Sequence, residues 1–331
     1  MKPILSVVLI FLGCNVLLSC KAQPQLKPLA SNPDERTLLW EISGQGLVQP
    51  SYVYGTMHLM CRGDWQWNEN LKAAITRSKE VYFEMDLDDA SNTLGTMFFI
   101  NMTGNKKLRD VLPETDYQKV TSFFKDSLNV SVQLFERMKP GLLDVLFYPK
   151  LMACKQQTGV EEELMKLAKE QKKEVNGFET GQYQASLFDS IPYTEQAAGL
   201  LKTIDSFTQY RQSFDSLLLA YKNQDLQAME NLFGKEDMGL ESHMDLLLYN
   251  RNRNWVEKLK KILPEKNIFI AVGAGHLVGE KGVLALLKKA AVRSFCALTS
   301  NPKIGASCVL NNPITVPFTS TTAMLTSAGE P

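Results

Sequence analysis

Histidine is the scarcest chemically versatile residue in this sequence, with only His58, His243 and His276 among 331 residues. Charge of one sign is not in excess either, because Lys+Arg and Asp+Glu both number 36. Without a basic field or a long charge run, the chain is not expected to bind nucleic acid through phosphate contacts. The glycine pattern of a dinucleotide-binding loop and the spaced cysteines of a zinc finger are also missing. These absences favour a globular domain whose partners are not polyanions.

No stretch of the sequence is apolar over the roughly 20 residues that a membrane-spanning helix needs. The apolar run between Ile4 and Leu18 is interrupted, and it follows the basic start Met1-Lys2. This pattern is typical of a secretory signal. The run ends in Leu17-Leu18-Ser19-Cys20, which resembles a bacterial lipobox. We therefore expect residues 1–20 to be a signal peptide with Cys20 as the acylated residue; the alternative is a plain signal peptide cleaved near Lys21-Ala22-Gln23.

An acylated Cys20 would hold the protein at a bacterial membrane, since each buried CH₂ of an acyl chain adds about 0.8 kcal/mol. Residues 21–36 are polar and contain proline, which suits a tether between the anchor and the fold. Lys21, rather than an aspartate, follows the cysteine and favours the outer membrane. We expect an exported cell-envelope lipoprotein, with a periplasmic or secreted protein as the alternative.

Of six cysteines, four lie beyond this signal: Cys61, Cys154, Cys296 and Cys308. An exported compartment permits disulfides. Cys61–Cys154 is the pairing that we prefer, because both residues lie in patterned sequence. The spacing of the four cysteines lacks the Cys-x-x-Cys pattern of thiolate zinc sites, so metal binding by cysteine is not expected.

The apolar pattern predicts an α/β fold, with α+β as the alternative, in which helices flank a central mixed sheet. Strands are expected at 38–42, 51–54, 81–85, 174–179 and 267–272, and the last of these is continuously apolar, as in buried parallel strands. Helices are expected at 70–79, 161–173, 197–248, 255–262 and 281–289, and mainly helices at 94–157, which makes a large helical insertion in the middle. The domain should cover 37–300. Residues 301–331, rich in Ser, Thr, Pro and Asn, should form a poorly ordered tail.

Two of the three histidines share one local frame, Gly-x-x-His after a β-prone run: Gly55 precedes His58, and Gly273 precedes His276. The glycines would let the backbone turn sharply and a ligand approach closely. Because ligands bind at the carboxyl ends of strands in open α/β sheets, both imidazoles could face one cleft and bind a transition metal. The alternative is that each histidine caps its strand by hydrogen bonding.

Three further residues could join the histidines. Glu84 and Glu179 each follow a probable core strand, and two carboxylates beside two imidazoles suit a metal site or an acid/base pair. Arg251 could stabilise an oxyanion. Alternatively, each acid caps the next helix and Arg251 lies on a solvated helix face. His243 lies outside these motifs, and we expect a surface or loop histidine.

Five strings occur in order: Tyr54-Gly55-Thr56-Met57-His58-Leu59, Phe83-Glu84-Met85-Asp86, Gly177-Phe178-Glu179-Thr180 with Gln184, Arg251-Asn252-x-x-Trp255 and Val272-Gly273-Ala274-Gly275-His276-Leu277. Together they resemble the TraB/PrgY/GumN family, which includes the TIKI metalloproteases, over roughly 38–289. The resemblance implies a compact fold related to the erythromycin-esterase and ChaN-like proteins. It also implies a divalent metal, Mn²⁺ or Co²⁺ with Zn²⁺ as the alternative, acting with the Gly-x-x-His pair and a glutamate. The family usually closes its sheet with a short strand after the last helix, which residues 291–295 fit poorly.

By this motif match, the roles fall on His58, Glu84, Glu179, Arg251 and His276. We predict an exported metal-dependent hydrolase, a peptidase acting on a peptide or protein, with His58, His276 and one glutamate, Glu84, as metal ligands. The other glutamate would be a general base or support the ligands, and the order of the two glutamates stays open. The alternatives are a non-catalytic peptide- or haem-binding envelope lipoprotein, and a metal-free enzyme that uses His58 as general base.

Overall fold

The continuously apolar run at 268–272 forms an interior strand of a β-sheet. The computed structural model describes residues 36–44, 47, 49–89, 96–152, 154–233, 243–290, 294–297 and 307–310. In it, strand β7 (Ile268–Gly273) lies between β4 (Glu80–Met85) and β2 (Ser51–Thr56). Because β7 has neighbours on both edges and helices on both faces, successive residues such as Phe269 and Ile270 are both buried.

Seven strands of the described chain form this sheet, in the order β6-β4-β7-β2-β1-β8-β9. The remaining strands are β1 (Leu39–Ser43), β6 (Glu174–Glu179), β8 (Ser294–Ala297) and β9 (Ser307–Leu310). The β2, β7, β4 and β6 strands run parallel, whereas β1 pairs antiparallel with β2 and β8, and β8 with β9. The predicted mixed sheet is confirmed, and β1 and β2 form an antiparallel pair at its start. A separate two-stranded ladder joins β3 (Met60–Cys61) to β5 (Gln157–Thr158).

Helices fill most of the remaining described chain. The α-helices are α1 (Glu69–Arg77), α3 (Glu114–Phe123), α4 (Tyr148–Leu151), α5 (Val160–Glu170), α6 (Gly181–Leu187), α7 (Tyr193–Asp205), α8 (Phe207–Lys222), α9 (Leu226–Phe233), α10 (Asn250–Ile262) and α11 (Val283–Lys289). Short 3₁₀ turns occupy Arg62–Asp64, Leu108–Asp110, Val132–Phe135, Pro140–Leu146, Phe188–Ser190 and Ala274–His276, and π-helical turns occupy Phe124–Leu128 and Asp245–Tyr249.

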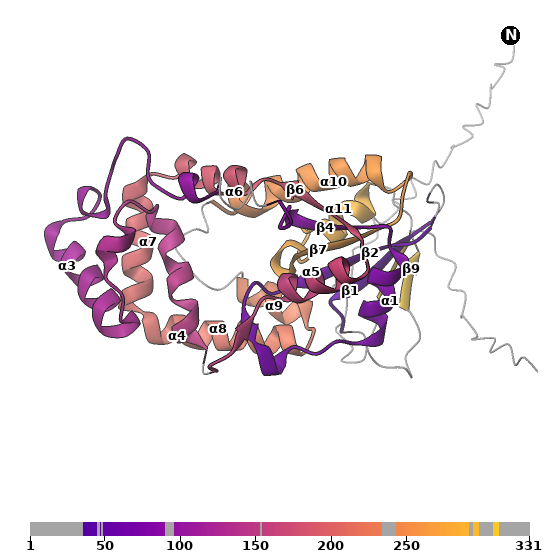
Figure 1. Cartoon of the computed structure of the whole chain (residues 1–331), viewed down its shortest axis with the longest axis horizontal. Coiled ribbons are helices and arrows are strands. Elements are labelled where there is room, and N and C mark those ends of the chain that lie inside the picture. The colour runs from indigo at the N-terminus through magenta and orange to yellow at the C-terminus, as the bar shows by residue number, and fades with distance from the viewer. Residues whose placement is uncertain are drawn as a thin grey trace, which may run out of the picture. The chain divides into compact units, whose positions relative to one another are not determined.

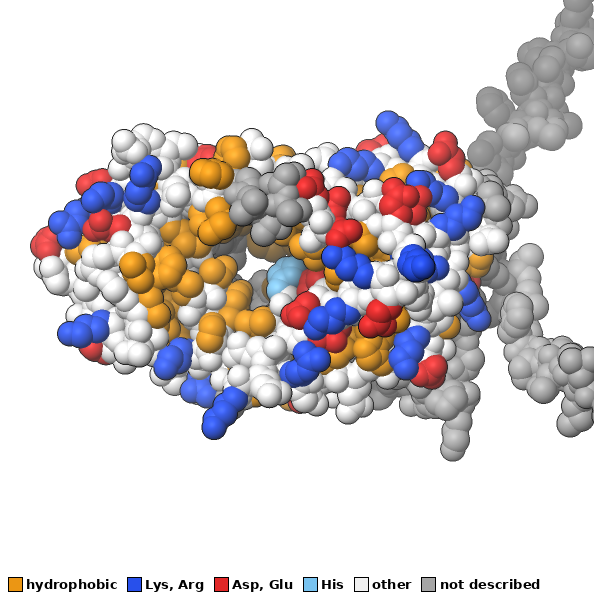
Figure 2. Space-filling view, in the orientation of Figure 1, with side chains coloured by type: hydrophobic (Ala, Val, Ile, Leu, Met, Phe, Trp, Pro, Cys, Tyr) orange, Lys and Arg blue, Asp and Glu red, His pale blue; other side chains and the backbone are white. Residues whose placement is uncertain are grey.

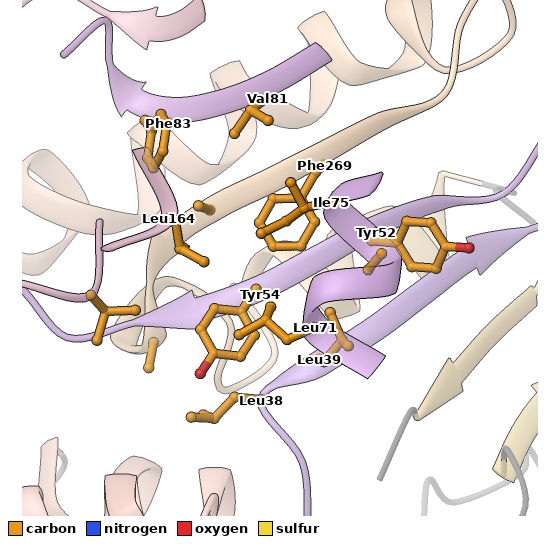
Figure 3. Packing of buried hydrophobic residues seen from close by; sticks show 14 of the residues in the cluster. Leu38, Leu39, Tyr52, Tyr54, Leu71, Ile75, Val81, Phe83, Leu164 and Phe269 are labelled. Atoms are coloured by element: carbon orange, nitrogen blue, oxygen red, sulfur yellow. The ribbon is translucent and has the colours of Figure 1, made fainter. Parts of the chain in front are cut away.

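Helices cover both faces of the sheet (Figure 1). On one face, α1, α5, α8 and α9 bury a cluster that includes Tyr54, Phe83 and Phe269, and Figure 3 shows Leu71 and Ile75 of α1 packed there. On the other face, α10 and α11 pack against Val53, Ile270 and Val272, among others. Burying each such side chain contributes about 1.5–3 kcal/mol, so this alternation of faces holds the strands in register.

The helical insertion has a core of its own. Residues of α3, α4 and α7 and the turns between α3 and α4 form a third apolar cluster, in which Phe124 and Phe147 are fully buried. Two chain segments contribute to this cluster, 108–151 and 200–214. In the sequence, the first lies between β4 and β6 and the second between β6 and β7. The large helical insertion predicted in the middle of the chain is therefore present, although much of its first half is made of short turns.

Three sequence expectations need adjustment. The helix expected at 161–173 ends at Glu170, because Lys172 adopts a left-handed conformation (φ 56°). The sheet does continue after the last helix, with β8 and β9. Strand β9 lies inside the segment 301–331, for which little order was predicted, and the rest of that segment lies outside the described residues. Its order comes from backbone pairing with β8, a long-range contact that apolar periodicity does not reveal. Within the described residues, no helix is both long and apolar enough to cross a membrane.

Candidate functional site

The predicted site residues gather at one edge of the sheet. The parallel strands β2, β7, β4 and β6 all present their carboxyl ends there, which is where ligands bind in open α/β sheets. His58 follows β2, His276 ends the turn after β7, Glu84 lies near the end of β4, and Glu179 ends β6. Strand topology thus brings together side chains that are widely separated in the sequence.

The three side chains expected to hold a metal converge on Gly273. A Cβ atom placed on Gly273 would lie 3.2 Å from Glu84 Oε1, 3.7 Å from His58 Nε2 and 3.7 Å from His276 Cδ2. Gly55 is crowded in a similar way, since its Cβ would lie 3.1 Å from the Cβ of Ala274. Neither glycine has a positive φ. The chain does turn after Gly273, into the 3₁₀ turn Ala274–His276, but without the left-handed backbone that favours glycine. Both glycines matter because little room is left for a larger side chain.

Both imidazoles are oriented through Nδ1. His58 Nδ1 lies 2.7 Å from Glu161 Oε1, and His276 Nδ1 lies 2.5 Å from Asn252 Oδ1. The Asn252 amide nitrogen donates to the carbonyl of Lys281, so its oxygen is the acceptor toward His276. Nδ1 therefore carries the proton on His276. The other nitrogen, Nε2, faces the site in His58, whereas His276 Nε2 lies between Arg251 Nη1 and Glu84 Oε1. A metal-binding histidine is oriented through its second nitrogen in the same way.

Arg251 on α10 connects the carboxylates. Its Nη2 lies 2.7 Å from Glu84 Oε2, its Nε lies 2.9 Å from Glu179 Oε2, and its Nη1 lies 3.3 Å from His276 Nε2. Gln184 donates to Glu179 at 3.1 Å. All these side chains are buried, so their charges act in a low-dielectric environment and must be compensated locally. The positive guanidinium supplies that compensation for two carboxylates.

The charges shift the pKa values of the site in opposite directions. Burial opposes ionisation of Glu84, but attraction to His276, Arg251 and His58, with the Gly273 N–H bond, outweighs it and lowers the pKa of Glu84 to about 2. Burial lowers the pKa of His276 to about 4, so this ring is neutral at pH 7. The hydrogen bond to Glu161 raises the pKa of His58 to about 9. At neutral pH, the site therefore combines an anionic Glu84, a neutral His276 and a protonated His58.

A disulfide fixes the loop that carries His58. Cys61 and Cys154 are joined, which is the pairing that the sequence favoured. This bond and the β3–β5 ladder hold the residues after His58 against the start of α5, where Glu161 lies. Glu161 also accepts a hydrogen bond from Thr56 at 2.6 Å. The result is that the His58 ring is oriented although its side chain is 72% exposed.

The remaining predicted residues lie elsewhere. His243 pairs with Glu195 of α7 at 2.8 Å and takes no part in the site. Cys20 lies outside the described residues, so its predicted acylation stays a prediction. Across the part of the chain that the structure describes, no group of three or more His, Cys, Asp or Glu side chains could hold a metal ion as it stands.

Sequence reasoning missed Glu161, and it quoted Asn252 and Trp255 within a motif without giving either a role. Glu161 is one of three consecutive glutamates that begin a charged helix, and no local signal distinguishes it from Glu162 and Glu163. Asn252 stands next to Arg251, and Trp255 lies one helical turn further, with its ring 4.4 Å from that of His276. Arg251 and Trp255 are four positions apart on one helix, and this spacing was the signal that both side chains lie on the same helix face.

Comparisons with known proteins identify the family to which the chain is similar. A model of the TraB/PrgY/gumN family matches residues 38–293. The chain is 25% identical to Metalloprotease TIKI1 of Homo sapiens, covering 82% of this chain and 63% of that protein. It is 24% identical to Metalloprotease TIKI1 of Xenopus tropicalis (76% and 60% covered) and 24% identical to a Metalloprotease TIKI homolog of Amphimedon queenslandica (78% and 61%).

The chain thus spans about three fifths of the length of these curated relatives. No solved structure matches significantly, so the likeness to erythromycin-esterase and ChaN-like proteins stays a prediction. The family match covers most of the chain and includes all five residues that line the sheet edge. This chain belongs to the TraB/PrgY/gumN family.

Proposed function

We propose that this protein is a metal-dependent peptidase whose metal is held by His58, Glu84 and His276. The observation that carries the proposal is the pair of imidazoles whose Nδ1 atoms each contact a fixed acceptor. His58 Nε2 faces the space around Gly273, and His276 Nε2 lies 3.6 Å from Glu84 Oε1. Carboxylates and amides that hydrogen-bond to one ring nitrogen orient metal-ligating histidines in this way. The similarity to proteins named metalloproteases supports both the metal and a peptide or protein substrate.

The chemistry of the donor set fits a divalent ion. Two imidazole nitrogens and a carboxylate oxygen suit Mn²⁺, Co²⁺ or Zn²⁺, and we favour the first two from the family resemblance. Glu84 is anionic and His276 is neutral at pH 7, as ligands must be, whereas His58 is protonated there and would have to release the proton on Nε2 to bind the ion. His58 has the most exposed side chain of the three, so it is the ligand with room to adjust.

The bound ion would polarise the scissile carbonyl and lower the pKa of its water toward 7. The protein's own residues prepare the site around it. With a pKa of about 2, Glu84 is a poor proton acceptor, which assigns it to charge compensation and ligation. Glu179 and Gln184 hold Arg251 in place, and Arg251 keeps positive charge next to the position where an oxyanion would develop.

The two alternatives receive less support. A metal-free mechanism needs an unprotonated His58 as general base, but the hydrogen bond to Glu161 raises its pKa to about 9 and keeps the ring protonated at pH 7. A non-catalytic haem carrier needs a large cavity. The cavity of about 520 Å³ that Phe98, Asn101 and Arg137 help to line has no histidine among its described lining residues, and the cavity beside His58 measures about 160 Å³. Pockets for drug-sized ligands start at roughly 300 Å³.

The test combines metal analysis with peptide cleavage. The purified protein is stripped with a chelator, reloaded with Mn²⁺, Co²⁺ or Zn²⁺, and assayed against a mixed peptide library. We expect metal-dependent cleavage that is lost in His276→Ala. The matched control is His243→Ala, which removes the one histidine outside the site. Cleavage that survives chelation, or that is unchanged in His276→Ala while the protein stays folded, would overturn the proposal.

We also propose that the protein is exported and anchored through Cys20. The lipobox-like sequence before Cys20 supports this, and so does the Cys61–Cys154 disulfide, since such bonds persist in oxidising compartments. Cys20→Ser should move the protein from the membrane fraction to the soluble fraction of the cell envelope. Equal membrane association of both forms would contradict the anchor.

A further inference from the structure

An apolar cavity opens directly beside His58. It measures about 160 Å³ and is lined by Met57, His58, Leu59, Tyr148, Tyr210, Ser213, Phe214, Leu217, Leu232 and Phe233. Figure 2 shows hydrophobic side chains gathered around a hollow, with a histidine side chain at its edge. His58 is the only ionisable side chain among the described lining residues besides the two tyrosines. The cavity therefore suits an uncharged, apolar group.

The cavity and the catalytic edge of the sheet share walls. His58 lines the cavity while its Nε2 faces the space around Gly273. Phe233 of α9, which also lines the cavity, lies against Gly275, since a Cβ on Gly275 would be 3.2 Å from the Phe233 ring. Gly275 directly precedes His276. A group bound in the cavity would therefore contact His58, and it would also contact Phe233, which packs next to the residue before His276.

The walls of the cavity are built to contact a large side chain. Tyr148 and Phe214 pack together with their ring centroids 5.8 Å apart. The hydroxyls of Tyr148 and Tyr210 hydrogen-bond to each other, so their polar ends are satisfied. An engineered apolar cavity of about 150 Å³ in another protein binds benzene, so a volume of this size accommodates one phenyl ring or a branched aliphatic side chain.

We infer that this cavity is a specificity subsite for one large apolar side chain, phenylalanine or leucine, of the peptide substrate. The inference rests on the proposed peptidase function and adds the residue class that the substrate must carry near the bond to be cut. Burial of such a side chain is worth about 1.5–3 kcal/mol, which corresponds to about a tenfold to hundredfold preference over alanine. A charged side chain finds no partner in this lining and should be rejected more strongly.

The test uses acetylated hexapeptides of glycine and alanine that carry one varied residue: phenylalanine, leucine, alanine or aspartate. Cleavage by the metal-loaded protein is compared with binding of the same peptides, measured by calorimetry on the metal-free protein. Ser213→Trp fills the cavity from α8, and Ser213→Leu fills it with a smaller side chain. Ser216→Trp is the matched control, since Ser216 lies on the same helix, is exposed and does not line the cavity.

In the unmodified protein we expect phenylalanine and leucine peptides to exceed the alanine peptide by tenfold or more, both in cleavage and in binding. Ser213→Trp should remove this preference, whereas Ser216→Trp should retain it. Thermal melting checks that each variant folds, and Ser213→Leu replaces Ser213→Trp if the larger side chain prevents folding.

The outcomes separate the two proposals. Cleavage without any preference for large apolar residues overturns the subsite and leaves the peptidase standing. Selective binding of the phenylalanine peptide that Ser213→Trp abolishes, with no cleavage of any peptide, supports the subsite while the proposed peptidase fails. A preference that persists unchanged in both Ser213 variants overturns the subsite, because the selective pocket would then lie elsewhere.

Discussion

Removing the negative charge of Glu161 tests how His58 is held. In Glu161→Gln the side-chain oxygen can still accept a hydrogen bond from Thr56, so the substitution mainly removes the charge that faces the imidazole. The His58 pKa should fall from about 9 toward its ordinary value of 6.5, since the hydrogen bond to Glu161 is the largest cause of its elevation. The expected effect is a loss of stability that depends on pH.

The sign and size follow from proton linkage. A folded-state pKa above the unfolded value means that protonated His58 stabilises the fold below pH 6.5, and that this contribution disappears as the pH rises through about 9. The difference between these pKa values corresponds to at most about 3 kcal/mol. His58 is 72% exposed, and solvent screening reduces the contribution to about 1 kcal/mol.

The assay is urea unfolding of the metal-free protein at about pH 6 and about pH 9.5, from which the free energy of unfolding is obtained by linear extrapolation. Glu161→Gln should be less stable than the unmodified protein by about 1 kcal/mol at the lower pH, and the difference should vanish at the higher pH. Glu162→Gln is the control, because Glu162 makes only an exposed ion pair with Lys166. An equal loss at both pH values, or the same pH dependence in the control, would refute the reasoning.

Three other predictions concern the site, the helical insertion and the disulfide. Asn252→Ala should free the His276 ring and weaken metal binding by roughly 10- to 100-fold in calorimetry, with unchanged affinity contradicting the orienting role. Burial raises the pKa of Asp144 to about 6, so this residue costs the fold up to about 3 kcal/mol as the pH rises from about 4 to about 6. Asp144→Asn should therefore stabilise the protein at pH 7 in urea unfolding; a less stable variant would contradict this. Because Cys61 and Cys154 are separated by 93 positions, Cys154→Ser should lower the free energy of unfolding by about 4 kcal/mol, and a loss below about 1 kcal/mol would show that the denatured chain gains little freedom.

Local sequence was sufficient to predict much of this protein. Strands β1, β2, β4, β6 and β7 lie where apolar runs were expected, because a buried strand needs an unbroken or alternating apolar sequence whatever its neighbours are. The repeated Gly-x-x-His frame identified both imidazoles that meet at Gly273. In a sheet of parallel strands, the residues that follow the carboxyl ends of the strands lie at the same edge. The repeated local motif therefore predicted that the two histidines lie close together.

Tertiary structure alone decided what each of these side chains touches. Glu161 and His58 are 103 positions apart, and Arg251 and Glu84 are 167 apart, so their contacts depend on how helices pack onto the sheet and leave no periodic trace in the sequence. The cavity beside His58 likewise joins the loop after β2 to residues from α4, α8 and α9. Composition and periodicity report whether a residue is buried, whereas the partner that it meets, and the pKa that results, are set by long-range packing.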